Sequence, residues 1–340
     1  MKNERISLIL DFIKREGEVS IAQIVEHLSQ VLGKKTSKVT INRDLSILLN
    51  ENKIEKVGIS VATRYKIKLN IDEYFLIRAN ERVLKSETYN LNIWNELKDI
   101  FTTQELVDIS TVNKEYQENR KKLSPTILRK EIERLTIELS WKSSEIEGNT
   151  YTLLDTERLI LERKEAEGKK HEEAVMILNH KTALDFIFAD PYYFKTLSIQ
   201  KIEELHRLLV IDLNVNVGVR KNRVGITGTK YHPLKTEFQI REELFNLVAE
   251  INKRENPFER AFITVLMISY MQPFEDGNKR TARILANALL LADDYCPLSY
   301  RSVDEMEYKK TMILFYEQNN FSYFKKMFVQ QFKDAIDKYF

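Results

Sequence analysis

One short stretch, QPFEDGNKRTAR at residues 272–283, gathers side chains suited to phosphate chemistry. It follows an apolar run over 261–271 that has the length of a buried helix, and Pro273 and Gly277 supply the break and the tight turn. A second helix is expected from Asn278. The first amides of a helix lack backbone acceptors and carry the positive end of its dipole, so they attract anions. The stretch predicts a polyphosphate site, and a basic helix–loop–helix without a nucleotide is the alternative.

Three cations and one carboxylate belong to the same stretch. Lys279, Arg280 and Arg283 can donate to phosphate oxygens, and the two arginines are neighbours on a helix because they lie three positions apart. Asp276 offers one hard oxygen ligand, which is enough for a Mg²⁺ ion that also binds phosphate oxygens and water. We therefore expect Mg²⁺ to bind together with the polyphosphate.

These residues resemble the signature loop of the Fic (Fido-fold) family of protein adenylyltransferases, whose pattern is H-P-F-x-D/E-G-N-G/K-R-x-x-R. The chain matches every specified position except the first, where Gln272 replaces the family's catalytic histidine. The resemblance implies ATP and Mg²⁺ as cofactors and Asp276 as the metal ligand. It implies that the nucleotide is bound by Gly277, Asn278, Lys279, Arg280 and Arg283, with catalytic positions at Gln272, Asn278 and Arg280.

In the family's reaction, the loop histidine takes the proton of a Ser, Thr or Tyr hydroxyl on a target protein. The hydroxyl attacks the α-phosphate of ATP, AMP is transferred and pyrophosphate leaves. The carboxamide of Gln272 can orient a hydroxyl but cannot accept its proton near neutral pH, and losing a general base commonly costs roughly 10²–10⁴-fold. Three functions stay open: an adenylyltransferase of low activity, an inactive nucleotide-sensing regulator, and a phosphotransferase like the related Doc toxins.

A second motif follows a long amphipathic helix expected over residues 126–144. Ser143, Glu147 and Gly148 resemble the inhibitory motif of the Fic family, S/T-x-x-x-E-G/N. The resemblance implies that Glu147 pairs with Arg283 and occupies the place of the γ-phosphate of ATP. The alternative is an ordinary carboxylate near a helix end.

Residues 218–233 interrupt the helical pattern with three glycines around β-branched residues, which predicts a β-hairpin. In the Fic family a hairpin at this point is the flap, which pairs with an extended stretch of the target protein. The resemblance implies that four flap residues lie near the nucleotide: Ile226, Thr227, Gly228 and Thr229. A hairpin that only covers the core is the alternative. His232 is expected to be a turn residue, with a role as substitute base left open.

Residues 1–68 predict a winged helix-turn-helix. Three helices are expected, the second opened by a capping box of Ser20 and Gln23 and the third capped by Ser37. Two β-type runs at 53–57 and 63–68 follow, with Gly58 at their turn. The recognition helix and wing resemble those of DeoR-type transcriptional regulators.

This segment is basic, with 13 Lys and Arg against 8 Asp and Glu, a net of +5, whereas the whole chain has +2. Its candidate DNA contacts are Lys38, Thr40, Asn42, Arg43, Arg64 and Lys66. DNA is therefore an expected partner, and protein docking is the alternative.

Composition fixes the broad class. The 340 residues and their few glycines and prolines predict two or three domains and a mostly α fold. The resemblances imply a winged helix-turn-helix over 1–68 and an all-helical Fic domain with its flap over 126–340, with a helical connector over 69–125 between them. Cys296 is the single cysteine, so we expect a reduced cytoplasmic setting without disulfides. Neither a signal peptide nor a membrane span is expected, and a homodimer is left open. His180 and His206 are expected to be core or surface histidines.

Overall fold

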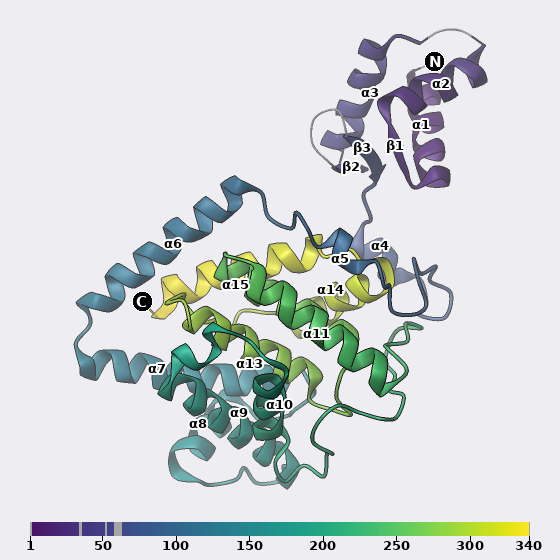
Figure 1. The fold of residues 1–340 in the computed structure, drawn as a ribbon. Coiled ribbons are helices and arrows are strands. Elements are labelled where there is room, and N and C mark those ends of the chain that lie inside the picture. The colour runs from purple at the N-terminus through teal and green to yellow at the C-terminus, as the bar shows by residue number, and fades with distance from the viewer. Residues whose placement is uncertain (1, 34–35, 52, 58–62, 340) are drawn as a thin grey trace. The chain divides into compact units, whose positions relative to one another are not determined.

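The structure, a computed structural model, describes residues 2–33, 36–51, 53–57 and 63–339. The chain divides into two compact units, Met1–Ile77 and Arg78–Phe340 (Figure 1). Helices dominate both units, so the predicted mostly α class is confirmed. None of the described helices is long and apolar enough to cross a membrane.

The first unit is a winged helix-turn-helix with one strand more than predicted. Its three-stranded antiparallel sheet has the order β1-β3-β2, with Glu18 opposite Lys66 and Val57 opposite Arg64. The unpredicted strand is β1, which has only three residues and depends on pairing with the distant β3. Gly58 lies outside the described residues. The elements are α1 (Lys2–Glu16), β1 (Glu18–Ser20), α2 (Ile21–Leu32), α3 (Lys38–Asn50), β2 (Ile54–Val57), β3 (Arg64–Ile67) and α4 (Ile71–Leu76).

Local signals and one ion pair define the helices of this unit. Ser20 and Gln23 form the predicted capping box of α2, and Ser37 caps α3 by accepting from the Thr40 amide. Arg5 of α1 holds α3 through the carboxylate of Asp44, which is 2% exposed and also accepts from Arg5 Nη2 at 3.0 Å. The orientation of α3 against α1 is therefore specified by a polar contact as well as by the apolar core.

The second unit is all-helical and is built around two central helices, α12 and α13. Its elements are α5 (Ile93–Glu96), α6 (Thr103–Lys122), α7 (Pro125–Glu145), α8 (Leu153–Glu162), α9 (His171–Ala189), the 3₁₀ helix η2 (Pro191–Lys195), α10 (Ile199–Val210), α11 (Glu237–Lys253), α12 (Pro257–Met271), α13 (Asn278–Leu291), α14 (Glu305–Gln318) and α15 (Ser322–Tyr339).

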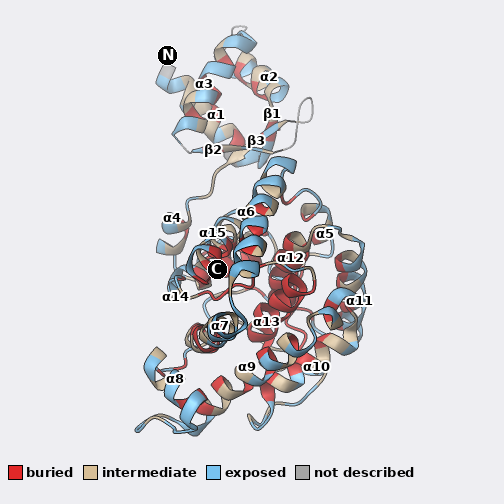
Figure 2. Ribbon diagram, turned by 90° about the vertical axis from the view of Figure 1, so that its left-hand side faces the viewer, coloured by how far each residue is buried: buried red, intermediate tan, exposed pale blue. Residues whose placement is uncertain are grey.

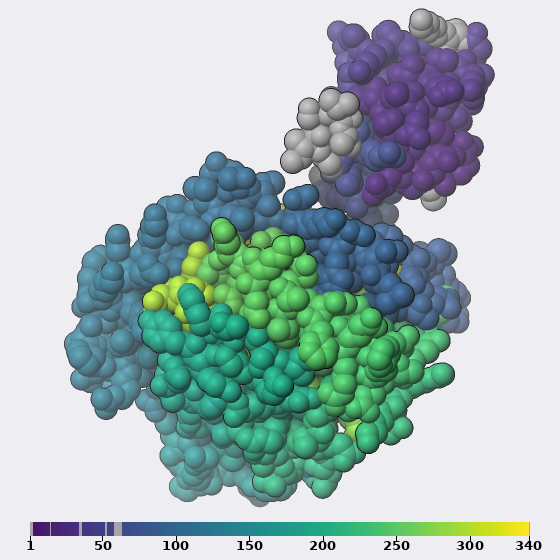
Figure 3. Space-filling model, viewed as in Figure 1, coloured from purple at the N-terminus to yellow at the C-terminus, as the bar shows by residue number. Residues whose placement is uncertain are grey.

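Helices α12 and α13 are buried on almost every side (Figure 2). A helix with no solvent face belongs in the middle of a helical domain, which agrees with the uninterrupted apolar run before the loop. In the space-filling view, the face turned to the viewer is covered by blue, teal and green residues of earlier elements such as α6 and α11 (Figure 3). The loop between the central helices is thus held by the two most deeply buried helices described above.

Two predicted segments differ from the structure. Residues 78–125 of the predicted connector are part of the second compact unit, because α6 packs Ile109 and Tyr116 into its core. The hairpin predicted over 218–233 is not formed, and the segment, all of it described, contains only an isolated parallel bridge from His232 to Thr88. Its backbone bonds lead elsewhere, since the amide of Arg220 donates to Pro273 and that of His232 to Glu87.

Candidate functional site

The α12–α13 loop, residues 272–277, reverses the chain between the two central helices. Gln272 ends α12 in the left-handed region at φ 50°. Asn278 closes the loop, because its side chain accepts from the Phe274 amide and donates to the Phe274 carbonyl, both at 2.8 Å. Gly277 takes φ 78° before α13, whose start has no side-chain cap. The first amides of α13 are therefore available to an anion.

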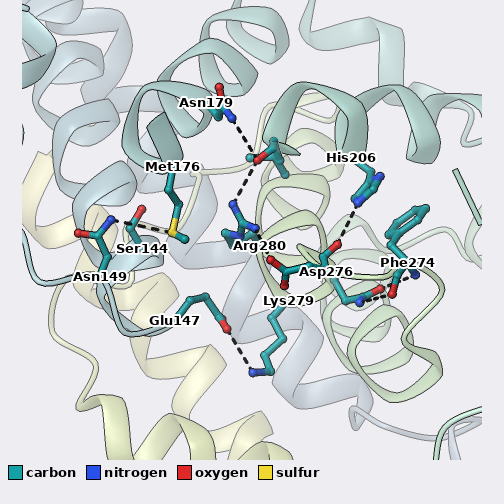
Figure 4. Close-up of polar contacts among 12 residues, drawn as sticks. Ser144, Glu147, Asn149, Met176, Asn179, His206, Phe274, Asp276, Lys279 and Arg280 are labelled. Atoms are coloured by element: carbon teal, nitrogen blue, oxygen red, sulfur yellow. Dashed lines mark hydrogen bonds and ion pairs between the residues drawn. The ribbon is translucent and has the colours of Figure 1, made fainter. Parts of the chain in front are cut away.

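Arg280 links the loop to α10. Its guanidinium is 2% exposed, and it donates to the Leu209 carbonyl at 3.2 Å and to Asp276 Oδ2 at 3.1 Å (Figure 4). The side chain of Asp276 is 69% exposed, and its Oδ1 has no partner among the described residues. One carboxylate oxygen is therefore accessible at the edge of the loop.

The predicted inhibitory glutamate meets two cations of the loop. Glu147 Oε1 accepts from Arg283 Nη2 at 2.9 Å, and Oε2 accepts from Lys279 Nζ at 3.2 Å. Arg283 is fully buried, whereas the side chain of Glu147 is 18% exposed. Burial alone would raise the pKa of Glu147, but the charges of Arg283 and Lys279 outweigh burial and lower the pKa to about 2. The carboxylate is therefore ionised at physiological pH.

The end of α7 is fixed by contacts of Ser143, which lies four residues before Glu147. Ser143 accepts from Arg283 Nε at 2.9 Å through its hydroxyl and from Arg283 Nη2 at 2.8 Å through its carbonyl. His180 lies 2.9 Å from the same hydroxyl through Nε2, and burial together with the neighbouring arginines lowers its pKa to about 3. Gly148 follows at φ 93°, which favours glycine. All three predicted inhibitory residues therefore meet at one place.

A cavity of about 440 Å³ opens over this cluster. Its walls come from the end of α7, the segment 224–227, the α12–α13 loop with the start of α13, and one face of α14. Helix α14 contributes functional residues that the sequence motifs did not indicate. Its contribution could have been found in the helical spacing of its lining residues, which are Tyr308, Lys309, Met312, Ile313 and Tyr316.

The four predicted flap residues divide into two pairs. Ile226 and Thr227 line the cavity. Gly228 and Thr229 are not in its lining, because the Gly228 carbonyl accepts from Arg82 and the Thr229 hydroxyl accepts from the Tyr231 amide at 3.0 Å. The segment therefore contributes one wall of the cavity without forming a hairpin.

The side chain of Gln272 lines the cavity and has a defined orientation. Its Nε2 donates to the Ser269 carbonyl at 2.7 Å, so Oε1 is the atom left without a partner among the described residues. Arg220, 2% exposed, donates to the Gln272 carbonyl at 2.6 Å and holds the backbone at this position. The site thus presents a hydrogen-bond acceptor, not a base, at the first position of the loop.

None of the five histidines, all of them described, lines the cavity. His232 is exposed and belongs to the bridge with Thr88, so a role as substitute base has no geometric support. His180 and His206 are buried, as a core role predicts. Burial lowers the pKa of His206 to about 4, so its ring is neutral at physiological pH.

The predicted DNA contacts lie on the surface of the first unit. Lys38, Asn42, Arg43 and Arg64 are exposed, whereas Thr40 and Lys66 are half-buried. Lys66 pairs with Glu55 at 3.2 Å. By contrast, Lys38, Arg43 and Arg64 have no side-chain partner among the described residues. These three cations are free to meet phosphates.

Two family models match parts of the chain. Residues 196–290 match the Fic/DOC family, and residues 5–58 match the DeoR-like helix-turn-helix domain. Among curated proteins, the protein adenylyltransferase Fic of Drosophila willistoni and that of Drosophila melanogaster are each 31% identical over 157 residues, 45% of this chain. The match spans 31% and 32% of those proteins, so this chain covers about a third of their length.

Solved structures share the fold. The Fic-1 protein of C. elegans has a TM-score of 0.57 at 20% identity, covering 73% of this chain and 79% of that one. A Fic domain containing signaling protein of Bacteroides thetaiotaomicron has a TM-score of 0.59 at 21% identity, covering 68% of this chain and 94% of that one. The chain therefore shares the fold of these Fic structures, and two of its segments match the Fic/DOC and DeoR-like helix-turn-helix models.

Proposed function

We propose that the Fic/DOC family domain of this chain binds ATP with Mg²⁺ in the 440 Å³ cavity and transfers AMP slowly to a protein hydroxyl. The observation that carries the proposal is the convergence of Arg283, Lys279 and the uncapped start of α13 on one place, where Glu147 is the only described carboxylate that both cations contact. Such a cluster is an anion site that already holds an internal anion.

The cavity suits a nucleotide in size and in the distribution of its lining. Pockets of roughly 300–1,000 Å³ hold ligands of this class. Ile226, Met312 and Ile313 supply an apolar wall for a base, and the loop supplies the polar wall for phosphates. The two walls therefore favour a ligand with one aromatic and one anionic end.

Asp276 fits the single carboxylate that a nucleotide-bound Mg²⁺ requires. No group of three described His, Cys, Asp or Glu side chains is arranged to hold a metal by protein ligands alone. Mg²⁺ often takes one or two carboxylates and completes its shell with phosphate oxygens and water, and Asp276 Oδ1 is accessible for that. When bound, the ion would neutralise charge that develops on the phosphates.

The chain's residues position the substrates, but the first position of the loop offers no general base for the proton. In AMP transfer, the target hydroxyl oxygen forms a bond to the α-phosphorus, the bond from that phosphorus to pyrophosphate breaks, and the hydroxyl proton must leave. Gln272 Oε1 can accept a hydrogen bond from the hydroxyl and orient it, but the proton must pass to water. The α13 amides and Arg280 would stabilise the phosphate charge. Slow transfer follows.

Glu147 would inhibit the site by competing with the γ-phosphate of ATP for Arg283. An ATP molecule whose terminal phosphate needs Arg283 must displace a carboxylate that is already bound at 2.9 Å. Displacement also breaks the Lys279 pair, so two charged hydrogen bonds oppose the productive position of the nucleotide. Autoinhibition of this kind acts on the γ-phosphate more than on the base.

A second candidate is a nucleotide-sensing regulator without transfer activity, which binds DNA through the first unit. Two observations favour it: the acceptor-only Oε1 of Gln272, and the exposed cations Lys38 and Arg43 of α3, whose side chains have no partner in the described part of the chain. In that case the nucleotide would bind as a signal, and its release or hydrolysis would not modify a protein.

Labelled ATP separates these functions. Full-length protein is incubated with Mg²⁺ and ATP labelled on the α-phosphate or, separately, on the γ-phosphate, with and without lysate. Transfer of the α-label to any protein supports adenylyl transfer, and transfer of the γ-label alone would indicate a phosphotransferase. Binding of Mg·ATP in calorimetry without either transfer would favour the sensor, and absence of binding would contradict both candidates.

A further inference from the structure

His206 on α10 contacts the α12–α13 loop. Its side chain is fully buried, and its Nε2 donates to the Asp276 carbonyl at 2.9 Å (Figure 4). Its ring stacks on Phe274 with centroids 3.7 Å apart and planes 10° from parallel. One side chain therefore holds the loop at two residues, Phe274 and Asp276.

The same end of α10 supports the residues that follow. A Cβ on Gly277 would lie 3.0 Å from Val210 Cγ1 and 3.5 Å from His206 Cδ2, so the loop rests directly on these two side chains. The Leu209 carbonyl accepts from Arg280. Helix α10 thus contacts several residues of the stretch 274–280 through its C-terminal turns.

The second ring nitrogen of His206 indicates that the histidine contributes a bond to the loop rather than apolar packing in the core. Nδ1 is buried and has no hydrogen-bond partner among the described residues. A phenylalanine would fill the same space and stack on Phe274 without this unsatisfied nitrogen. Within the described residues the ring makes one polar contact, the bond to the Asp276 carbonyl, and that bond is what distinguishes histidine from an aromatic hydrocarbon here.

We propose that His206 is a positioning residue of the nucleotide site, which fixes the Asp276 carbonyl and thereby the directions of the Asp276 carboxylate and of the amides that start α13. The proposal rests on the function proposed above. A peptide unit held by its carbonyl cannot rotate, so the side chain on one side of it and the amide on the other keep their directions before the ligand arrives.

Two substitutions separate the hydrogen bond from the ring. His206→Phe keeps a stacking ring and removes the donor, whereas His206→Gln keeps an amide donor at the position of Nε2 and removes the ring. Ile202→Val is the control, because Ile202 is a fully buried residue of the same helix whose side chain cannot donate a hydrogen bond to the loop. Hydrogen exchange of the loop amides in the nucleotide-free protein, the melting temperature and Mg·ATP affinity are measured for each.

We expect His206→Phe to speed exchange of the amides over 274–280 and to weaken Mg·ATP binding, each by about three- to tenfold, the size of one lost hydrogen bond. Its melting temperature should stay equal to the wild type's or rise. His206→Gln should keep slower exchange and tighter binding than His206→Phe, and Ile202→Val should lower only the melting temperature. Unchanged loop exchange in His206→Phe, or equal losses in both His206 variants, would overturn the proposal. If the wild type binds no Mg·ATP, the proposed function fails, while the exchange data still test the positioning.

Discussion

The cations of the two candidate binding surfaces, the exposed face of the first unit and the cavity of the second, are in opposite states. In the first unit, Lys38, Arg43 and Arg64 are exposed and have no side-chain partner among the described residues. In the second, Arg283 is fully buried and Lys279 is 29% exposed, and both are bound to Glu147. The first set can meet a polyanion without any change of structure, whereas the second must first release its own carboxylate.

Because of this difference, the affinity for an anion depends on a different factor in each unit. Exposed cations gain by releasing counterions from a nucleic acid, so their affinity depends on salt. Buried cations are fixed in direction and little screened, so their affinity depends on the internal competitor. We expect the largest change at the cavity of the second unit, a smaller one at the exposed cations of the first, and the smallest ones at Glu147.

The largest effect is expected where the site lacks a base. Gln272→His supplies a proton acceptor with a pKa near the working pH and should raise labelling from α-labelled ATP by at least about tenfold. Combined with Glu147→Gly, which frees Arg283 and Lys279, the rise should reach about 10²-fold or more. The measurement is the rate of label transfer to the protein itself or to lysate.

Gln272→Asn is the matched control, since it keeps a carboxamide and should gain nothing. If the double variant binds Mg·ATP tightly and still transfers no label, more than the base is missing. The sensor function should then be preferred.

A smaller effect is expected in the first unit. If the three free cations contact three phosphates, log affinity falls with log salt at a slope of about −2.7, so raising salt from about 50 to 200 mM weakens DNA binding about 40-fold. Arg43→Ala should reduce this slope by about one if it contacts a phosphate, or relax sequence preference if it contacts a base. Fluorescence anisotropy with full-length protein measures both.

Arg15→Ala is the control for charge, because Arg15 is exposed on α1 and pairs with Glu16 at 2.8 Å. It should leave the slope unchanged. Failure of the wild type to retain DNA even at low salt would support protein docking through this unit instead.

The competition at Glu147 predicts a nucleotide-dependent effect. Glu147→Gly should tighten ATP binding by about tenfold, the scale of one charged hydrogen bond, and ADP binding by less, because only ATP has the phosphate that needs Arg283. Calorimetry with both nucleotides measures the difference. Glu145→Gly is the control, since Glu145 pairs with Lys142 outside the cavity. Equal changes for ATP and ADP would rule out this role of Glu147.

The smallest effect concerns pH. The pKa of Glu147 is lowered from its ordinary 4.5 to about 2 in the folded protein, so its charge contributes stability above pH 4.5 and loses that contribution as the pH falls toward 2. Glu147→Gln keeps an acceptor but removes the charge, which should cost about 1 kcal/mol at pH 7. Thermal unfolding should show this difference shrinking below pH 4.5. A difference that stays constant down to pH 3 would contradict the ion pair.

Much of the fold could be predicted from local sequence because its signals are local. The caps at Ser20 and Ser37 and the apolar run before the loop each specify a helix within a few residues. The hairpin over 218–233 was wrong because β-branched residues between glycines show only that the segment is extended. Arg82, from another part of the unit, binds the Gly228 carbonyl, and Arg220, within the segment, binds the Asn222 carbonyl at 2.7 Å, so these carbonyls are not paired as in a hairpin.

The sequence by itself determined which chemical groups the site could use, since the loop and the Ser143–Gly148 motif are contiguous in the chain. It also determined the missing base at Gln272. Only the tertiary structure decided which groups meet: Glu147 reaches Lys279 and Arg283 across 132 and 136 residues, and α14 closes the cavity from a separate helix. Contacts over such separations depend on how whole helices pack against α12 and α13, and no local pattern records that packing.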